Sequence, residues 1–216
     1  LNNLAHYYRH LGNYTEAIRL GTLAVEIREK VLGKEHPDYA SSLNNLAYYN
    51  EELGNYAEAI RLGTQALEIR KKVLGEEHPD YASSLSCLAY YNDELGNYTE
   101  AINLETQAME IRKKVLGEEH PDYFLSLHNL ATYNLIADNY DAATDYYSQC
   151  YNCLNSFILK TFASLTTKER NDFWKANSGL FTKALPYAAY KIASAPVETS
   201  YYGVSTTNGV ATKKTI

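Results

Sequence analysis

Apolar residues recur along this chain at three- and four-residue intervals, the spacing that places them on one face of a helix. Leu43, Leu46 and Leu53 follow this spacing and predict one helix. Gly54 comes directly after them, where a glycine commonly ends a helix. A second helix follows, with an apolar stripe in steps of four, three and four that is formed by Leu62, Ala66, Ile69 and Val73. The pattern therefore predicts a helical hairpin.

Polar residues predict where these helices begin. Asn55 precedes Glu58 by three residues, the spacing of an N-cap and its capping-box partner. The same pair recurs as Asn13 with Glu16 and as Asn97 with Glu100. After the hairpin, residues 78–80 read His-Pro-Asp, and we expect them to begin the next helix, since proline suits its first turn and aspartate its positive end.

The hairpin is one copy of a 42-residue repeat. Residues 43–84 align without gaps on residues 85–126 with 33 of 42 positions identical, and residues 1–42 align equally well on residues 43–84. A fourth, less regular copy covers residues 127–156. A lone hairpin cannot bury both of its apolar faces, so the copies are expected to stack as an all-α solenoid over residues 1–156. The first helices are expected to line its concave side.

At these positions the repeat resembles the tetratricopeptide repeat in its long form. The places of the usual pattern are filled in the second copy by Leu43, Leu46, Ala47, Gly54, Tyr56, Ala59 and Ala66. The Asn-Asn-Leu-Ala and His-Pro-Asp segments are similar to those of kinesin light chains and of many bacterial repeat proteins. The resemblance implies a right-handed solenoid without catalytic activity. Where an aromatic residue is common, this chain has Gly21, Gly63 and Glu105, and we infer that neighbouring tyrosines fill the space.

Residues 157–195 predict a further helical hairpin. Thr166 or Thr167 can cap a helix that runs to about Lys183, and Pro186 can open the next helix. Leu165–Arg170 and the aromatic residues Phe173, Trp174 and Phe181 resemble the junction between repeats and the caspase-like CHAT peptidase domain of bacterial proteins. Residues 196–216 show no period and are expected to form a loosely ordered tail.

Charge is distributed unevenly along the chain. The net charge of −6 combines 23 acids and 12 bases in residues 1–156 with 3 acids and 8 bases in residues 157–216. An acidic body argues against nucleic-acid binding, which depends on clustered lysine and arginine. The chain has no apolar run long enough to span a membrane, and its three cysteines fit a reducing compartment, so a cytoplasmic protein is expected. The start inside a helix suggests a fragment.

Three features could carry chemistry, and each has a simpler interpretation. The His-Pro-Asp tripeptide also occurs in J-domain co-chaperones, but here it recurs at every repeat boundary. Cys150 and Cys153 fall where the other copies have buried alanine and isoleucine, so we expect packing rather than a redox or zinc site. Cys87 could be an exposed thiol on the concave helix. The histidines form no catalytic set, so no enzyme activity, cofactor or metal is predicted.

A function can be placed in the concave groove. The predicted groove residues are Asn2, Asn3, His6, Arg9, Asn44, Asn45, Tyr48, Glu51, Glu52, Tyr90, Asp93, Glu94, His128 and Asn129. The resemblance implies that Asn3, Asn45 and Asn129 bind an extended peptide backbone, and asparagine offers both a donor and an acceptor. The acidic residues favour a basic or polar protein partner.

Three alternatives remain. The groove residues could be a solvated face of a bare scaffold. The solenoid could be the regulatory segment of a larger CHAT peptidase whose catalytic domain lies beyond this chain. The basic C-terminal segment could also dock on the acidic solenoid.

Overall fold

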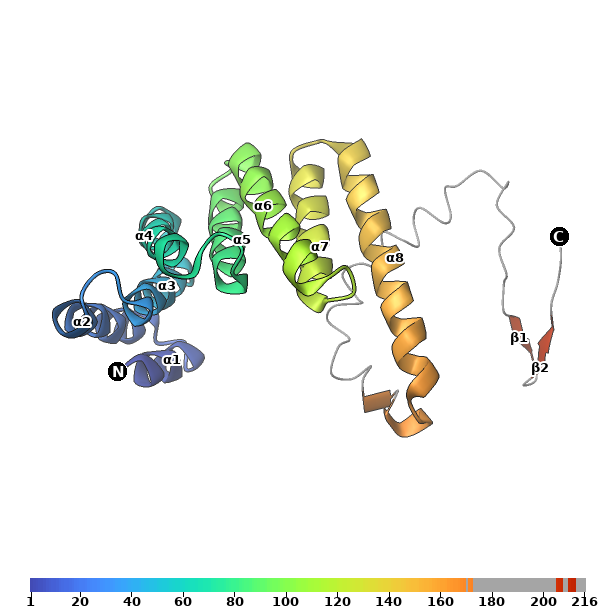
Figure 1. Ribbon diagram of the computed structural model, residues 1–216, viewed down its shortest axis with the longest axis horizontal. Helices are drawn as coiled ribbons and strands as arrows, with labels where there is room; N and C mark the ends of the chain where they lie inside the picture. The colour runs from blue at the N-terminus through green and yellow to red at the C-terminus, as the bar shows by residue number, and fades with distance from the viewer. Residues whose placement is uncertain (170, 173–204, 208–209, 213–216) are drawn as a thin grey trace.

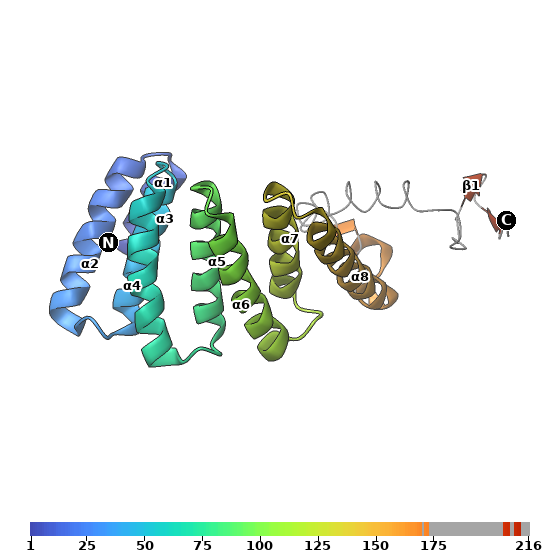
Figure 2. The ribbon, with the colours of Figure 1, turned by 90° about the horizontal axis from the view of Figure 1, so that it is seen from above.

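The computed structural model describes residues 1–169, 171–172, 205–207 and 210–212 (Figure 1). Residues 1–164 form the helices α1 (Asn2–His10), α2 (Tyr14–Leu32), α3 (Pro37–Glu51), α4 (Tyr56–Leu74), α5 (Pro79–Glu94), α6 (Tyr98–Leu116), α7 (Pro121–Ile136) and α8 (Tyr140–Ser164). They pair into four hairpins, each made of a first helix (α1, α3, α5 or α7) and a second helix (α2, α4, α6 or α8). The hairpins stack in chain order (Figure 2), which confirms the expected all-α solenoid.

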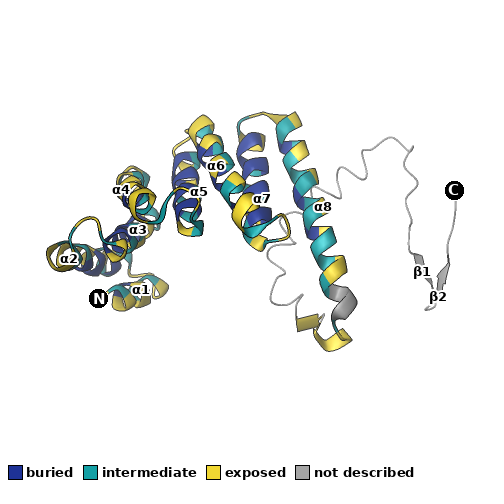
Figure 3. Ribbon diagram, in the orientation of Figure 1, coloured by how far each residue is buried: buried dark blue, intermediate teal, exposed yellow. Residues whose placement is uncertain are grey.

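The first helices lie on the inner side of the curved array, and the second helices follow its outer side (Figure 1). From the second hairpin on, each first helix packs against its own partner and against the second helix of the preceding hairpin. The first helices α3, α5 and α7 are accordingly the most deeply buried (Figure 3). Their remaining exposed residues face the inside of the curve.

Glycines in the second helices allow the hairpins to pack closely. A Cβ atom at Gly21 would lie 3.2 Å from Leu46 Cδ1 and equally near the ring of Tyr49. At Gly63 the same Cβ would lie 3.0 Å from Leu88 Cδ2. The leucine and tyrosine of the following hairpin therefore occupy the space that an aromatic side chain would need, which confirms the inferred tyrosine packing.

The His-Pro-Asp tripeptide begins α3, α5 and α7, as predicted. Pro79 is the first residue of α5, and Nδ1 of His78 accepts a hydrogen bond from the backbone N–H of Asp80 at 3.1 Å. His36 and His120 cap their helices in the same way. The tripeptide thus has a structural role at the start of each of these helices.

The predicted asparagine caps form in only one of the three repeats. The Asn13 side chain accepts a hydrogen bond from the backbone N–H of Glu16 at 3.2 Å. Asn55 and Asn97 make no such bond. Instead of closing a capping box, Glu58 accepts two hydrogen bonds from Arg61, at 2.6 and 2.7 Å. The stripe of the second helix is also shorter than predicted, since Val73 is 42% exposed.

The fourth hairpin departs from the others. Asp138 occupies the place of the turn glycines and has a φ of 60°. The helix α8 has 25 residues and continues past residue 156, where the solenoid was expected to end. Cys150 is buried on α8, as predicted, and burial raises the pKa of its thiol to about 11. Cys153 is half-buried.

Thr166 is an N-cap, as one of the two alternatives predicted. Its backbone N–H donates to Oε2 of Glu169 at 2.8 Å, and the backbone N–H of Glu169 lies 3.4 Å from the Thr166 hydroxyl. Residues 167–169 and 171–172 are helical. The remainder of the expected hairpin, with Phe173, Trp174, Phe181 and Pro186, lies outside the described residues.

Part of the expected tail forms a short hairpin. Strands β1 (Ser205–Thr207) and β2 (Val210–Thr212) pair antiparallel, with Thr206 opposite Ala211. These strands were not predicted, because residues 196–216 show no periodic pattern.

Candidate functional site

The predicted groove residues lie on the first helices, except for Glu52, which directly follows α3 as its C-cap, and none is fully buried. We call this surface the inner face. Asn3, His6, Asn45, Tyr48, Tyr90 and Glu94 are exposed. Asn2, Arg9, Asn44, Glu51, Glu52, Asp93, His128 and Asn129 are half-buried. The inner face therefore offers tyrosines and carboxylates to solvent.

The exposure of the row of asparagines Asn3, Asn45 and Asn129 is less uniform than the repeat suggests. Asn3 and Asn45 are exposed, and their amides are accessible to a ligand. Asn129 is instead half-buried and lies close to the buried carboxylate of Glu105. Cys87 interrupts the row, and it is half-buried rather than exposed because it packs against the core. Burial raises the pKa of its thiol, which argues against a reactive cysteine.

Arg9 of α1 joins the first hairpin to the second. Its Cζ atom lies 4.7 Å from the ring centroid of Tyr48, and Nη1 lies 3.6 Å from Oε1 of Glu52. The carboxylate of Glu52 also lies near Tyr14 at the start of α2 and raises the pKa of this tyrosine. We call Arg9, Tyr14, Tyr48 and Glu52 the Arg9 cluster. In it, one carboxylate balances one guanidinium.

An equivalent group lies one repeat further along. Tyr56, Tyr90 and Glu94 occupy the positions of Tyr14, Tyr48 and Glu52, but Glu51 replaces Arg9. Burial and the nearby carboxylate of Glu94 raise the pKa of Tyr56. Burial first, and then the negative charge of Glu52, raises the pKa of Glu51. We call these four residues the Tyr90 cluster.

The Tyr90 cluster carries two carboxylates and no cation. Burial and the nearby charges of Glu94 and Glu51 raise the pKa of Tyr90. Asp93 is adjacent on α5, and the pKa of its carboxyl is also raised, by burial and by Glu94. Within residues 1–169, Glu51, Asp93 and Glu94 have no ion-pair partner. This part of the inner face therefore has an unbalanced negative charge.

The fourth hairpin lacks both the tyrosine and the acids. Thr132 stands in place of Tyr90, and its hydroxyl lies 3.2 Å from that of Tyr147. The rings of His128 and Tyr147 are 5.8 Å apart and edge-to-face. Leu135 and Ile136 are 39% and 45% exposed where the preceding copy has Asp93 and Glu94. The inner face thus changes from acidic to apolar along the solenoid.

A buried carboxylate lies behind the inner face. Glu105 of α6 is fully buried at the position held by Gly21 and Gly63 in the earlier copies. Ser86 donates to its Oε1 at 3.1 Å, and Arg112 Nη1 lies 3.3 Å from the same oxygen. The departure from the family pattern at this position was visible in the sequence, but the pairing was not predicted.

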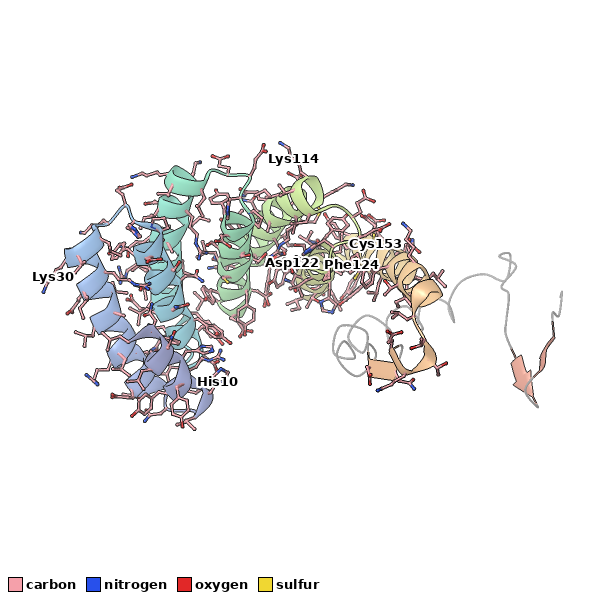
Figure 4. All side chains as sticks on the ribbon, turned by 60° about the horizontal axis from the view of Figure 1, so that its bottom comes forward. His10, Lys30, Lys114, Asp122, Phe124 and Cys153 are labelled. Atoms are coloured by element: carbon pink, nitrogen blue, oxygen red, sulfur yellow. The ribbon has the colours of Figure 1, made fainter. Side chains whose placement is uncertain are left out.

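Several lysines of the second helices form ion pairs with acids of the preceding hairpin. Lys72 pairs with Glu35 of the preceding hairpin at 3.1 Å, and Lys114 pairs in the same way with Glu77. Figure 4 shows Lys30 and Lys114 pointing outward, away from His10 on α1. Such exposed pairs add little stability. Glu51, Asp93 and Glu94 of the inner face form no such pair within residues 1–169.

Other chemistry is not supported in the part of the chain that the structure describes. Within those residues no group of three or more histidine, cysteine, aspartate or glutamate side chains could hold a metal ion. His6 and His10 approach to 2.9 Å on α1 without a third ligand. No helix among the same residues is long and apolar enough to cross a membrane.

The sequence matches the family model of the tetratricopeptide repeat over residues 1–72, 49–114 and 85–156. None of the curated proteins matches the chain. Among solved structures, the chain is similar to a Podosopora anserina protein described as a kinesin light chain with nearly identical TPR-like repeats. That likeness has a TM-score of 0.61 and 25% identity, and it covers 89% of this chain and 95% of the other.

Two more distant structures share the fold alone. BtubC (BKLC) from P. vanneervenii has a TM-score of 0.66 at 19% identity, covering 95% of this chain and 85% of the other. The apo form of RapI has a TM-score of 0.64 at 18% identity, covering 88% of this chain and 68% of the other.

Proposed function

Because the chain belongs to the tetratricopeptide repeat family, whose domains are generally non-catalytic protein-interaction modules, we propose that it binds an extended, basic peptide segment of a partner protein on the inner face. The observation that carries the proposal is the unbalanced charge of Glu51, Asp93 and Glu94 beside exposed tyrosines. A basic segment would supply the cations that the described residues do not provide.

The remaining contacts suit an extended peptide. The amides of Asn3 and Asn45 can each donate to and accept from a peptide backbone. Tyr48 and Tyr90 are 39% and 38% exposed, and tyrosine offers a large contact area at a low cost in conformational entropy. Backbone binding by asparagine and side-chain selection by tyrosine and acids would then act in neighbouring repeats.

The proposal is tested by selecting ligands from a displayed library of random peptides. We expect the enriched peptides to be basic. The double variant Tyr48→Ala/Tyr90→Ala should weaken their binding by about 1–3 kcal/mol for each anchor lost, with unchanged helicity. Glu51→Gln should also weaken their binding, because it removes one of the unbalanced charges. Glu77→Gln, on the outer edge, is its matched control and should not affect binding. Enrichment of acidic peptides, or unchanged affinity in the double variant, would refute the assignment.

The peptidase-regulatory function remains a second proposal. It is supported by the resemblance of Leu165–Arg170 to a repeat–peptidase junction, and the capping box of Thr166 and Glu169 begins a helix within this segment, as its residues predict. The sequence of the gene downstream of Ile216 tests it. An open reading frame that encodes a caspase-like histidine and cysteine pair is expected, and a stop codon there would reject the proposal.

A further inference from the structure

The Arg9 cluster shows how this repeat interface holds a guanidinium group. The guanidinium of Arg9 lies against the Tyr48 ring, at 4.7 Å from its centroid, and pairs with Glu52. The Arg9 side chain is only 14% exposed, so most of it is enclosed by the two hairpins. An arginine over an aromatic ring and beside a carboxylate gains from both cation–π and charge-assisted contacts.

The Tyr90 cluster repeats this arrangement without the guanidinium. The hairpins that form the two clusters are related by 42-residue copies with 33 identical positions, and the equivalent helices α3 and α5 both begin at the proline of a His-Pro-Asp turn. Tyr90 and Glu94 therefore lie on α5 as Tyr48 and Glu52 lie on α3. The side chain that should fill the space between them is Glu51, an acid in place of Arg9.

We propose that the Tyr90 cluster is a binding site for one arginine side chain of the partner peptide. The guanidinium would lie over the Tyr90 ring and pair with Glu94, as Arg9 does with its own tyrosine and glutamate. This inference rests on the proposed function, because it assigns one side chain of the peptide to one place on the inner face.

Glu51 makes the Tyr90 cluster selective for arginine over lysine. A guanidinium is planar and has five N–H donors, so it can bind two carboxylates while it stacks on a ring. Glu51 and Glu94 are both near enough to Tyr90 for their charges to raise its pKa. A lysine ammonium is a compact, strongly hydrated charge and cannot make the same stacked contact. The arrangement therefore favours arginine over lysine.

The site exists in one repeat only. In the fourth hairpin Thr132 and Ile136 replace the tyrosine and the glutamate, and in the first pair of hairpins Arg9 already fills the site. The peptide arginine should therefore bind between α3 and α5. Its position would set the register of the peptide along the solenoid.

The test uses the full chain and the probe N-acetyl-arginine amide, with N-acetyl-lysine amide as its matched control. Titration by two-dimensional NMR should shift the resonances of Tyr90 and Glu94 and leave those of Tyr48 unshifted. We expect the arginine probe to bind at least about threefold more tightly than the lysine probe. Equal shifts with the two probes, or shifts that map elsewhere, would overturn the proposal.

Exchanging the residues at the equivalent positions provides a second test. Glu51→Arg should fill the Tyr90 cluster from within and abolish the shifts at Tyr90. Arg9→Glu should open the Arg9 cluster and create a second set of shifts at Tyr48. Circular dichroism checks that both variants keep their helicity. Unchanged probe binding by both folded variants would refute the assignment, because exposed carboxylates alone would then explain the shifts.

The outcomes separate this inference from the proposed function. If basic peptides bind to the inner face but exchanging their arginines for lysines has no effect, the arginine site is wrong and the peptide-binding proposal remains. If the arginine probe binds at Tyr90 but no basic peptide is selected, the peptide-binding proposal is wrong and the site stands as a guanidinium site.

Discussion

Replacing Glu105 by glutamine removes a buried charge while keeping nearly the same side-chain shape. Glu105 is fully buried, and its Oε1 lies 3.3 Å from Nη1 of Arg112, whose side chain is 6% exposed. At this distance two unit charges attract by about 5 kcal/mol for an effective dielectric constant near 20. Removing each ion from water costs several kcal/mol, so the attraction and the desolvation are of similar size.

The pKa of Glu105 indicates whether the attraction to Arg112 or the cost of desolvation is larger. Burial raises it above the usual value of 4.5, although Ser126, Arg112, Ser86 and Asn129 all act to lower it. Ionisation of this carboxyl is thus harder in the folded protein than in the unfolded chain. The equivalent arginine in the second hairpin, Arg70, is half-buried and bonds to Ser84 of the next hairpin without an ion pair, so the serine can hold an arginine at this position without a carboxylate.

The sign of the pH effect follows from this direction. A carboxyl whose pKa is higher in the folded protein than in the unfolded chain contributes its full stabilisation at a pH below the unfolded-state pKa. This stabilisation is lost as the pH rises through the folded-state pKa. Glutamine does not titrate and loses nothing. Because ionisation of the buried carboxyl costs free energy that glutamine does not lose, we expect Glu105→Gln to raise the free energy of unfolding near pH 8. Near pH 5 the gain should be smaller.

Urea unfolding followed by far-ultraviolet circular dichroism at both pH values measures this difference. Glu110→Gln, an exposed change on the same helix, is the control and should show no such pH dependence. If Glu105→Gln instead destabilises the protein, and more so at the higher pH, the ion pair with Arg112 outweighs the desolvation and the reasoning is wrong.

Three further predictions concern other parts of the solenoid. Asp138→Gly should raise the free energy of unfolding by about 0.5–1 kcal/mol, because a φ of 60° is strained for aspartate; a lower stability in thermal unfolding would contradict this. Lys72→Ala should cost less than about 1 kcal/mol in urea unfolding, since its ion pair is exposed; a larger loss would show that the outer pairs join the hairpins. Cys153 should react with iodoacetamide faster than Cys150, because it is less buried; mass spectrometry after timed labelling would reveal the opposite order.

The fold could be predicted from the sequence because the same helix signals recur in each copy of the repeat. The periodic apolar residues, the turn glycines and the His-Pro-Asp starts each recur in chain order, so local and long-range signals agree. The asparagine caps were less predictable. Asn13 and Asn55 have equivalent neighbours, and Glu16 and Glu58 each pair with an arginine three residues further on, yet only Asn13 caps its helix. Spacing is the same in the two repeats and therefore could not distinguish them.

The candidate site was predictable as a surface but not as an arrangement. The helical positions of Tyr48, Glu51 and Tyr90 indicated that they face the groove. The contact of Arg9 with Tyr48 and Glu52 joins different hairpins, and it depends on how the hairpins stack. The repeat itself contained a signal that could have found it, because Arg9 and Glu51 occupy equivalent positions with opposite charge.

The glycine-centred faces of the second helices also bear on how the chain finds its native pairing. Gly21 and Gly63 present the same surface, and the leucine–tyrosine pairs of α3 and α5 that cover them are identical. A second helix could therefore accept the first helix of a wrong hairpin, or of another molecule, with similar contacts. The short connection of residues 33–36 makes α2 pack against α3, the helix that follows it in the same chain. Lengthening or cutting such a connection should promote domain-swapped assembly, since the side chains themselves do little to distinguish one neighbour from another.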